Sequence, residues 1–222
     1  MLAAGLHLNR WLVAADAFEL AEAPCSKALY ERLSGDSFEP VTRVLGSPPE
    51  EVRLQDGAGA GDLLDGWRDT FRILQANEVW GCHQCFLEEG DPRFGPGICE
   101  RFEMAKGVAA DQPVVEEARA RRETIRARMD ALLAGGAVLA MPTAPGAAPL
   151  KQLPTVELEV YRTRMLALTS VAGLCGLPQV NVPLAQTDEG PVGLSLVAAR
   201  GADEMLLDTA VALAEVLQLN KK

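Results

Sequence analysis

The stretch that decides the fold runs from Arg162 to Ala199 and reads RTRMLALTSVAGLCGLPQVNVPLAQTDEGPVGLSLVAA. Its first part carries apolar residues at helical spacing. Gly176 followed by Pro178 predicts the end of that helix, because glycine adopts the left-handed cap conformation and proline cannot continue a helix. Two apolar or β-branched segments then predict strands, Gln179–Leu184 and Gly193–Ala198. The polar residues between the two strands predict a short hairpin loop.

The rest of the chain alternates buried strands with amphipathic helices. The expected strands are Arg10–Ala15, Phe38–Leu45 and Ala137–Met141. The expected helices are Phe18–Leu33 with a break at Pro24, Asp62 to about Trp80, Ile98–Val108, Asp111 to about Leu133, and one that starts at Ala202. Ser47–Ala60 is rich in proline, glycine and acidic residues, which indicates a surface loop. The order predicts an α/β fold with a mixed β-sheet covered by helices.

Composition excludes several classes of function. The chain has 222 residues and a net charge of −10, and this charge argues against a nucleic-acid partner, because phosphate binding needs a positive face. No segment approaches the roughly 20 apolar residues that span a membrane, and the amino terminus lacks the basic region of a signal peptide. The cysteines number five, and an odd number in a sequence without a secretory signal favours free thiols and a cytoplasmic location.

A CxxC pair, Cys82-His83-Gln84-Cys85, has the spacing of a zinc or redox motif. A structural zinc site needs four ligands, and the sequence offers no second pair, so no metal or cofactor is expected. A cysteine nucleophile beside His83 is also disfavoured, because adjacent side chains on a helix diverge by about 100°. His7 remains an alternative partner for a cysteine, if the fold brings the two together.

Several motifs, taken in order, resemble the carboxy-terminal part of the amidase signature family. They are Met141-Pro142-Thr143-Ala144-Pro145, Gly176-Leu177-Pro178, Val182-Pro183, Gly190 to Val197 (GPVGLSLV), Gly201-Ala202-Asp203 and Leu206-Leu207. Gly190 and Pro191 are adjacent here, whereas the family often has a residue between them. A weaker resemblance over Ala76–Arg101 is to the plant-type branch near the indole-acetamide hydrolases.

This resemblance implies an amide hydrolase of which residues 1–222 form a single partial domain, the carboxy-terminal half of a large mixed-sheet fold. In the family, two serines in a Gly/Ser-rich stretch and an upstream lysine form the catalytic triad. Neither motif occurs in this chain, so no catalytic residue is expected in it. The resemblance therefore implies two partners: the missing amino-terminal half of the same enzyme, and a small or aryl carboxamide substrate.

The candidate substrate-binding residues are Thr143, Trp80 and His83. The resemblance places Thr143 close to the reacting serines, although a threonine here also suits the cap of a turn. Trp80 and His83 correspond to a segment that lines the substrate cleft in the plant-type branch, and packing in a core would explain both equally well. Ser195 is expected on a strand further from the Pro-Thr motif. Met165 is a candidate for closing the cleft, or for core packing.

Two functions of different classes are consistent with the sequence. The first is the carboxy-terminal portion of an amidase-signature hydrolase that acts on small or aryl carboxamides. The second is a non-catalytic interaction module or subunit that retains the half-domain. A reading frame upstream of Met1 that encodes a lysine and a Gly/Ser-rich serine motif would favour the first.

Overall fold

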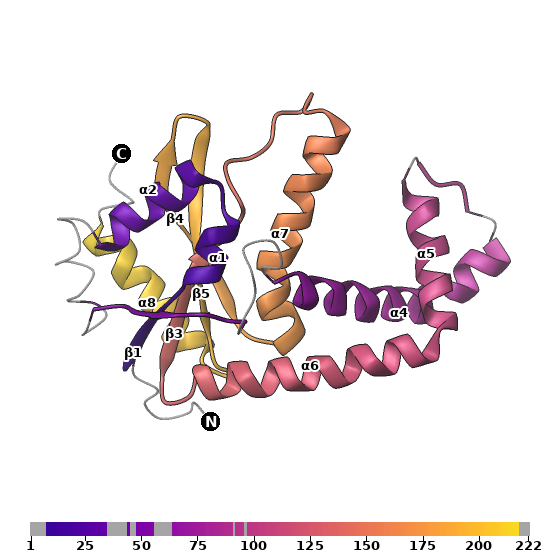
Figure 1. The fold of residues 1–222 in the computed structure, drawn as a ribbon, viewed down its shortest axis with the longest axis horizontal. Helices are drawn as coiled ribbons and strands as arrows, with labels where there is room; N and C mark the ends of the chain where they lie inside the picture. Colours follow the sequence, from indigo (N-terminus) through magenta and orange to yellow (C-terminus); the bar gives the residue numbers. More distant parts are fainter. Residues whose placement is uncertain are drawn as a thin grey trace.

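A mixed five-stranded sheet with the order β2-β1-β3-β5-β4 forms the centre of the protein, in a computed structural model that describes residues 8–34, 44, 48–55, 64–90, 92–95 and 97–217 (Figure 1). The strands are β1 Arg10–Ala14, β2 Glu50–Val52, β3 Ala137–Pro142, β4 Gln179–Thr187 and β5 Gly190–Ala198. Strand β1 runs parallel to both β2 and β3, whereas β5 is antiparallel to β3 and to β4. The predicted α/β class and mixed sheet are therefore confirmed.

Helices cover both faces of this sheet. They are α1 Ala15–Leu20, α2 Ala23–Ser34, α4 Asp65–Gly90, α5 Ile98–Ala110, α6 Gln112–Leu132, α7 Thr155–Cys175 and α8 Asp203–Val216. Side chains alternate along β3, so that Leu139 and Met141 join a core with α4, α6 and α7, while Val138 and Ala140 join a core with α2 and α8. Figure 1 shows α2 and α8 on one side of the sheet and α7 on the other.

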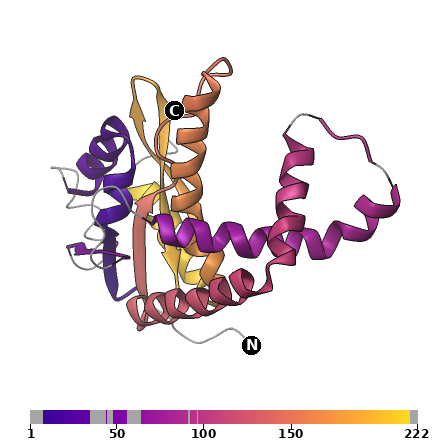
Figure 2. The same cartoon turned by 45° about the vertical axis from the view of Figure 1, so that its right-hand side comes forward.

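Helices α4, α5 and α6 form an arm that extends away from the sheet. Helix α4 packs against α5, α6 and α7, and the arm projects in both views (Figures 1 and 2). Within the described ranges, none of the helices combines the length and apolar character needed to cross a bilayer.

Several predicted boundaries are confirmed. Pro24 divides the first helical region into α1 and α2, and it lies at the start of α2, where a missing N–H costs nothing. Gly176 ends α7 in the left-handed conformation with φ of 62°. The hairpin strands pair over a longer stretch than expected, and only Asp188 and Glu189 remain between them. The predicted strand Phe38–Leu45 lies outside the described residues except for Val44.

Two expectations about the first third of the chain were wrong. Glu50–Val52 lies in the segment predicted as a loop, yet it forms β2, because it pairs in parallel with β1 and Arg10 bonds Glu50 at 2.7 Å. Helix α4 does not end near Trp80 but continues to Gly90. No proline occurs between Trp80 and residue 92, and α5 packs along the extension.

A buried carboxylate fastens β2 to the rest of the sheet. The Asp16 side chain is fully buried and accepts hydrogen bonds from the backbone N–H groups of Ala17, Leu54 and Gln55 at 3.2, 2.9 and 3.0 Å. These bonds join the start of α1 to the segment that follows β2. The aspartate thus satisfies backbone donors that no strand or helix pairs.

Replacing Asp16 by asparagine should lower the free energy of unfolding by about 2 kcal/mol, because one charge-assisted acceptor becomes an amide donor that faces an N–H group. Urea denaturation followed by circular dichroism measures the change. Asp188→Asn, in the exposed hairpin turn, is the matched control and should change stability by less than about 0.5 kcal/mol. Equal unfolding free energies for the two variants would contradict this role of Asp16.

Candidate functional site

Thr143 stands where the central strand β3 leaves the sheet. All six residues of β3 are buried, and Thr143 directly after them is half-buried. Its backbone N–H donates to the Gly193 carbonyl oxygen of β5 at 3.0 Å. The predicted Pro-Thr motif therefore lies at the end of a buried central strand, as the family resemblance implies.

The Thr143 hydroxyl belongs to a chain of four polar side chains from three strand segments. Thr143 Oγ1 donates to Asn181 Oδ1 at 2.6 Å and lies 2.9 Å from Ser195 Oγ. Gln179 Nε2 donates to the same serine oxygen at 2.6 Å. Since the Asn181 oxygen only accepts, Thr143 gives its one hydrogen to it, and the Ser195 hydroxyl donates to Thr143. Thr143 keeps one free lone pair, which can accept a hydrogen bond from a bound molecule.

The expectation that Ser195 lies further from the motif was wrong. The antiparallel register sets Met141 opposite Ser195, which brings the serine side chain next to Thr143 on the same face. Asn181 and Gln179 were missed in the sequence, although both are polar residues on one face of β4, two positions apart. That alternation was the available signal, but only the strand pairing connects it to Thr143.

The loop that follows Thr143 is held by three residues from two other parts of the chain. The Glu22 N–H donates to Pro145 O at 2.7 Å, the Cys25 thiol donates to Ala144 O at 3.8 Å, and the Tyr161 hydroxyl donates to Gly146 O at 3.4 Å. A side chain at position 146 would collide with the Glu22 carboxylate. Burial raises the pKa of Tyr161, and the nearby charges of Glu22 and then Cys25 raise it further.

Trp80 and His83 lie in the second half of α4 and pack against α5. The Lys106 ammonium sits 5.1 Å from the centre of the Trp80 ring, and the His83 ring meets Phe102 edge-on at 6.0 Å. His83 is exposed. In the part of the chain that the structure describes, no hydrogen bond or ring contact joins either residue to Thr143. The three candidate substrate residues therefore form two separate groups, and their substrate-binding role stays a prediction.

The CxxC pair lies on the exposed side of the same helix. Cys82 and Cys85 are both free and exposed on α4. Among the described residues, no three His, Cys, Asp or Glu side chains are arranged to hold a metal ion. His7, the alternative partner for a cysteine, lies outside the described residues. The four hydrogen-bonded side chains around Ser195 include no imidazole, carboxylate or amine that could activate a nucleophile.

The family model for amidase matches residues 83–207, more than half of the chain, and the chain belongs to the amidase (amidase signature) family. A similar relative is Amidase 1 of Arabidopsis thaliana, 35% identical over 145 residues that cover 65% of this chain and 34% of the relative. Another is the translocon at the outer membrane of chloroplasts 64 of Pisum sativum, 31% identical over 75% of this chain and 28% of the relative.

The fold agrees with this assignment. A solved structure described as a crystal structure of amidase has a TM-score of 0.74 and 26% identity, over 98% of this chain and 47% of that one. The chain spans about a third of the length of the curated relatives it matches.

If the four hydrogen-bonded side chains around Thr143 act as one unit, the contributions of Thr143 and Ser195 to the free energy of unfolding should not be additive. Thr143→Val leaves the buried Ser195 hydroxyl without its acceptor and should cost about 1–2 kcal/mol, whereas Ser195→Ala removes the donor of that bond together with the acceptor of the Gln179 amide. A double-mutant cycle measured by urea denaturation should show a coupling energy of about 1 kcal/mol.

The matched control for this cycle is Thr169→Val, because the Thr169 hydroxyl bonds only carbonyl groups of its own helix, Met165 O at 2.9 Å and Leu166 O at 3.4 Å. Combined with Ser195→Ala, the control should be additive within about 0.3 kcal/mol. A coupling energy near zero for Thr143 and Ser195 would show that the hydroxyls act separately.

The cysteines should divide into two classes by reactivity. Burial raises the pKa of Cys25 and Cys175 to about 11, with the Glu22 charge adding to the first shift and Asp130 to the second. Both therefore stay protonated near pH 8, and the thiol is a poor nucleophile. Alkylation with iodoacetamide, counted by mass spectrometry, should modify Cys82, Cys85 and Cys99 in the folded protein, and all five cysteines after denaturation. Fast modification of Cys25 or Cys175 in the folded protein would contradict this division.

Proposed function

We propose that the chain is the carboxy-terminal, substrate-pocket-bearing portion of an amide hydrolase that converts small or aryl carboxamides to a carboxylic acid and ammonia. The observation that carries this proposal is the match to the amidase family over residues 83–207. The position of the Pro-Thr motif at the end of a central strand supports it. Residues 1–222 are then one partial domain of a larger enzyme.

The catalytic groups would come from an amino-terminal portion, since the Gly/Ser-rich serine motif and its lysine are not in this sequence. Serine attack on an amide carbonyl needs an activated hydroxyl and fixed donors for the developing oxyanion. This chain would supply the substrate-side contacts. Thr143 has one lone pair available to accept a hydrogen bond from a substrate N–H group, and Trp80 and His83 would line a more distant part of the cleft.

Two exposed features suit such a partner. The first half of α7 leaves Val156 77% and Val160 49% exposed, and Leu150 just before it is 79% exposed. The second feature is the outer edge of β4, which pairs with none of the described strands. Pro183 and a register shift between Val182 and Ala185 interrupt this edge, which limits unspecific pairing. An obligate interface between the two portions would exceed about 2,000 Å².

The test is reconstitution. The purified chain alone should hydrolyse no simple amide above background, and addition of a separately expressed amino-terminal portion with the serines and lysine should produce ammonia from an aryl carboxamide. In that complex, Thr143→Val should lower turnover more than the loss of stability explains, whereas Thr169→Val should leave turnover within about twofold. Turnover by this chain alone, or a tight complex without turnover, would contradict the proposal.

A second candidate function is a non-catalytic interaction module. It is favoured by the similarity to the pea protein, whose name describes a translocon rather than a hydrolase and which matches 75% of this chain. The reading frame upstream of Met1 separates the two candidates. A frame that encodes a lysine and a Gly/Ser-rich serine motif supports the hydrolase, whereas a frame that extends without them supports the interaction module.

The free thiols suit a reducing compartment, and the proposal places the enzyme in the cytoplasm.

A further inference from the structure

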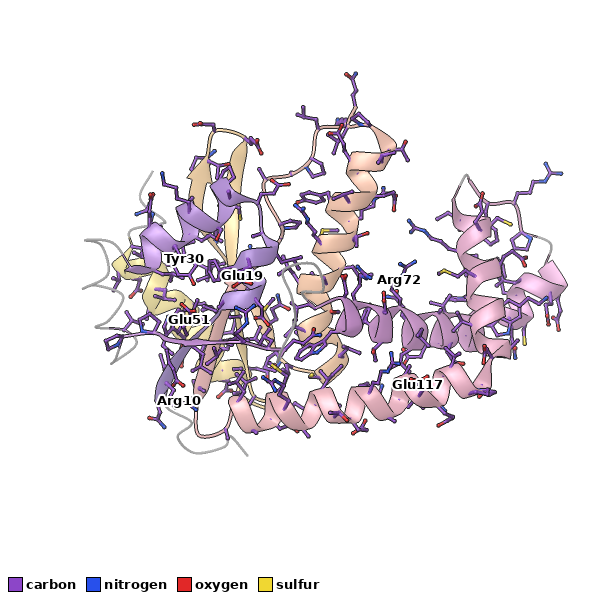
Figure 3. All side chains as sticks on the ribbon, viewed as in Figure 1. Arg10, Glu19, Tyr30, Glu51, Arg72 and Glu117 are labelled. Carbon is purple, nitrogen blue, oxygen red and sulfur yellow. The ribbon has the colours of Figure 1, made fainter. Side chains whose placement is uncertain are left out.

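A groove with a volume of about 820 Å³ lies between α4, α5 and α7. Helix α4 contributes one face to it, as the spacing of Arg68, Arg72 and Val79 shows. Figure 3 shows Arg72 extending from α4 into the space between α5 and α7. The volume is within the usual range of small-molecule sites. Thr143, Trp80 and His83 do not line this groove, so it is distinct from the site around Thr143.

The floor of the groove is apolar. Ala76 and Ala105 are buried at its base. Along its walls, Ile98, Met104 and Met165 remain 40%, 44% and 37% exposed, although all three are large apolar side chains. Met165 therefore lines this groove and does not pack in the core. Such surface favours a ligand with a hydrocarbon or aromatic part.

The rim of the groove is positive in an otherwise acidic protein. Four arginines and two glutamates line it, a local charge of +2, whereas the whole chain carries −10. Arg162 is paired with Glu159 at 2.6 Å. Arg68 is held by two carboxylates, Asp65 at 2.5 Å and Asp69 at 2.9 Å.

The other two arginines, Arg72 and Arg101, have no carboxylate within ion-pair distance in the part of the chain that the structure describes. The polar contact of Arg72 is the Met104 sulfur at 4.0 Å, a weak acceptor. Glu100, next to Arg101 in the sequence, also lines the groove and forms no ion pair with another described residue. Two guanidinium groups thus face an apolar groove with their donors largely unused.

We propose that this groove binds an amphipathic carboxylate, with the carboxylate held by Arg72 and Arg101 and its aryl or alkyl part on Ile98, Met104 and Met165. A planar guanidinium matches a carboxylate with two parallel hydrogen bonds, which a neutral amide cannot reproduce. The inference needs no catalytic activity, but the acid released from an aryl amide belongs to the same ligand class.

The test is calorimetric titration of the isolated chain with 4-phenylbutyrate and with its neutral analogue 4-phenylbutyramide. The acid should bind with a dissociation constant below about 1 mM, and the amide at least about tenfold more weakly. Arg72→Gln and Arg101→Gln should each weaken acid binding roughly three- to tenfold, because both groups are solvent-accessible. Raising the salt concentration should weaken binding of the acid but not of the amide.

Arg119→Gln on α6 is the matched control, because Arg119 pairs with Glu116 and lies outside the groove, and it should bind the acid like the unchanged protein. Circular dichroism shows whether each variant is folded, and Met104→Ser provides a second test that leaves every arginine in place. Equal affinity for acid and amide, or unchanged binding by both arginine variants, would overturn the proposal. None of these outcomes depends on whether reconstitution restores hydrolysis.

Discussion

The pairing of β3 on both sides is the constraint on which the structure depends. All six residues of this strand are buried, so every backbone N–H and C=O group needs a partner within the sheet. Strand β1 supplies the partners on one side in parallel, and β5 supplies them on the other side in antiparallel orientation. The amino-terminal segment and the carboxy-terminal hairpin are thereby joined through one strand, whose end places Thr143 beside Ser195.

Helix α7 connects the Thr143 site to the groove between α4, α5 and α7. Its Tyr161 holds the loop after Thr143, whereas Met165, about one turn further on, faces the groove next to Arg72. The helix then enters the core, where Leu168 is only 1% exposed. A shift of α7 along its axis would therefore affect the Thr143 loop and the groove together, while the buried half of the helix resists that shift.

The sequence indicated the elements that local chemistry determines. Gly176 and Pro178 marked the end of α7, and the apolar run Ala137–Met141 marked β3. Strand β2 could not be found in the same way, because Glu50–Val52 has no apolar alternation and becomes a strand only through its pairing with β1. The far end of α4 was missed because most of its residues are exposed, so the apolar spacing that marks a helix fades there.

The same distinction between local sequence signals and long-range pairing applies to the candidate site. Thr143 was found because it belongs to a local motif, whereas Asn181 and Ser195 reach it only through strand register, which no local pattern contains. The groove was equally inaccessible, since three separate helices line it, although the carboxylates that pair with Arg68 and Arg162 lie three residues away on the same helix as each arginine. The roles assigned to Trp80 and His83 rest on family resemblance and remain predictions.

The close approach of β4 to β5 limits how this family member can diverge. The space that a side chain at Gly193 would fill is occupied by the Asn181 amide, which is the group that accepts the Thr143 hydrogen bond. A larger residue at position 193 would therefore either displace the Asn181 amide or require a smaller residue at position 181, and both changes remove the acceptor of the Thr143 hydrogen bond. Across related sequences, positions 143, 181 and 193 should vary as a set, with glycine at 193 accompanying an amide at 181.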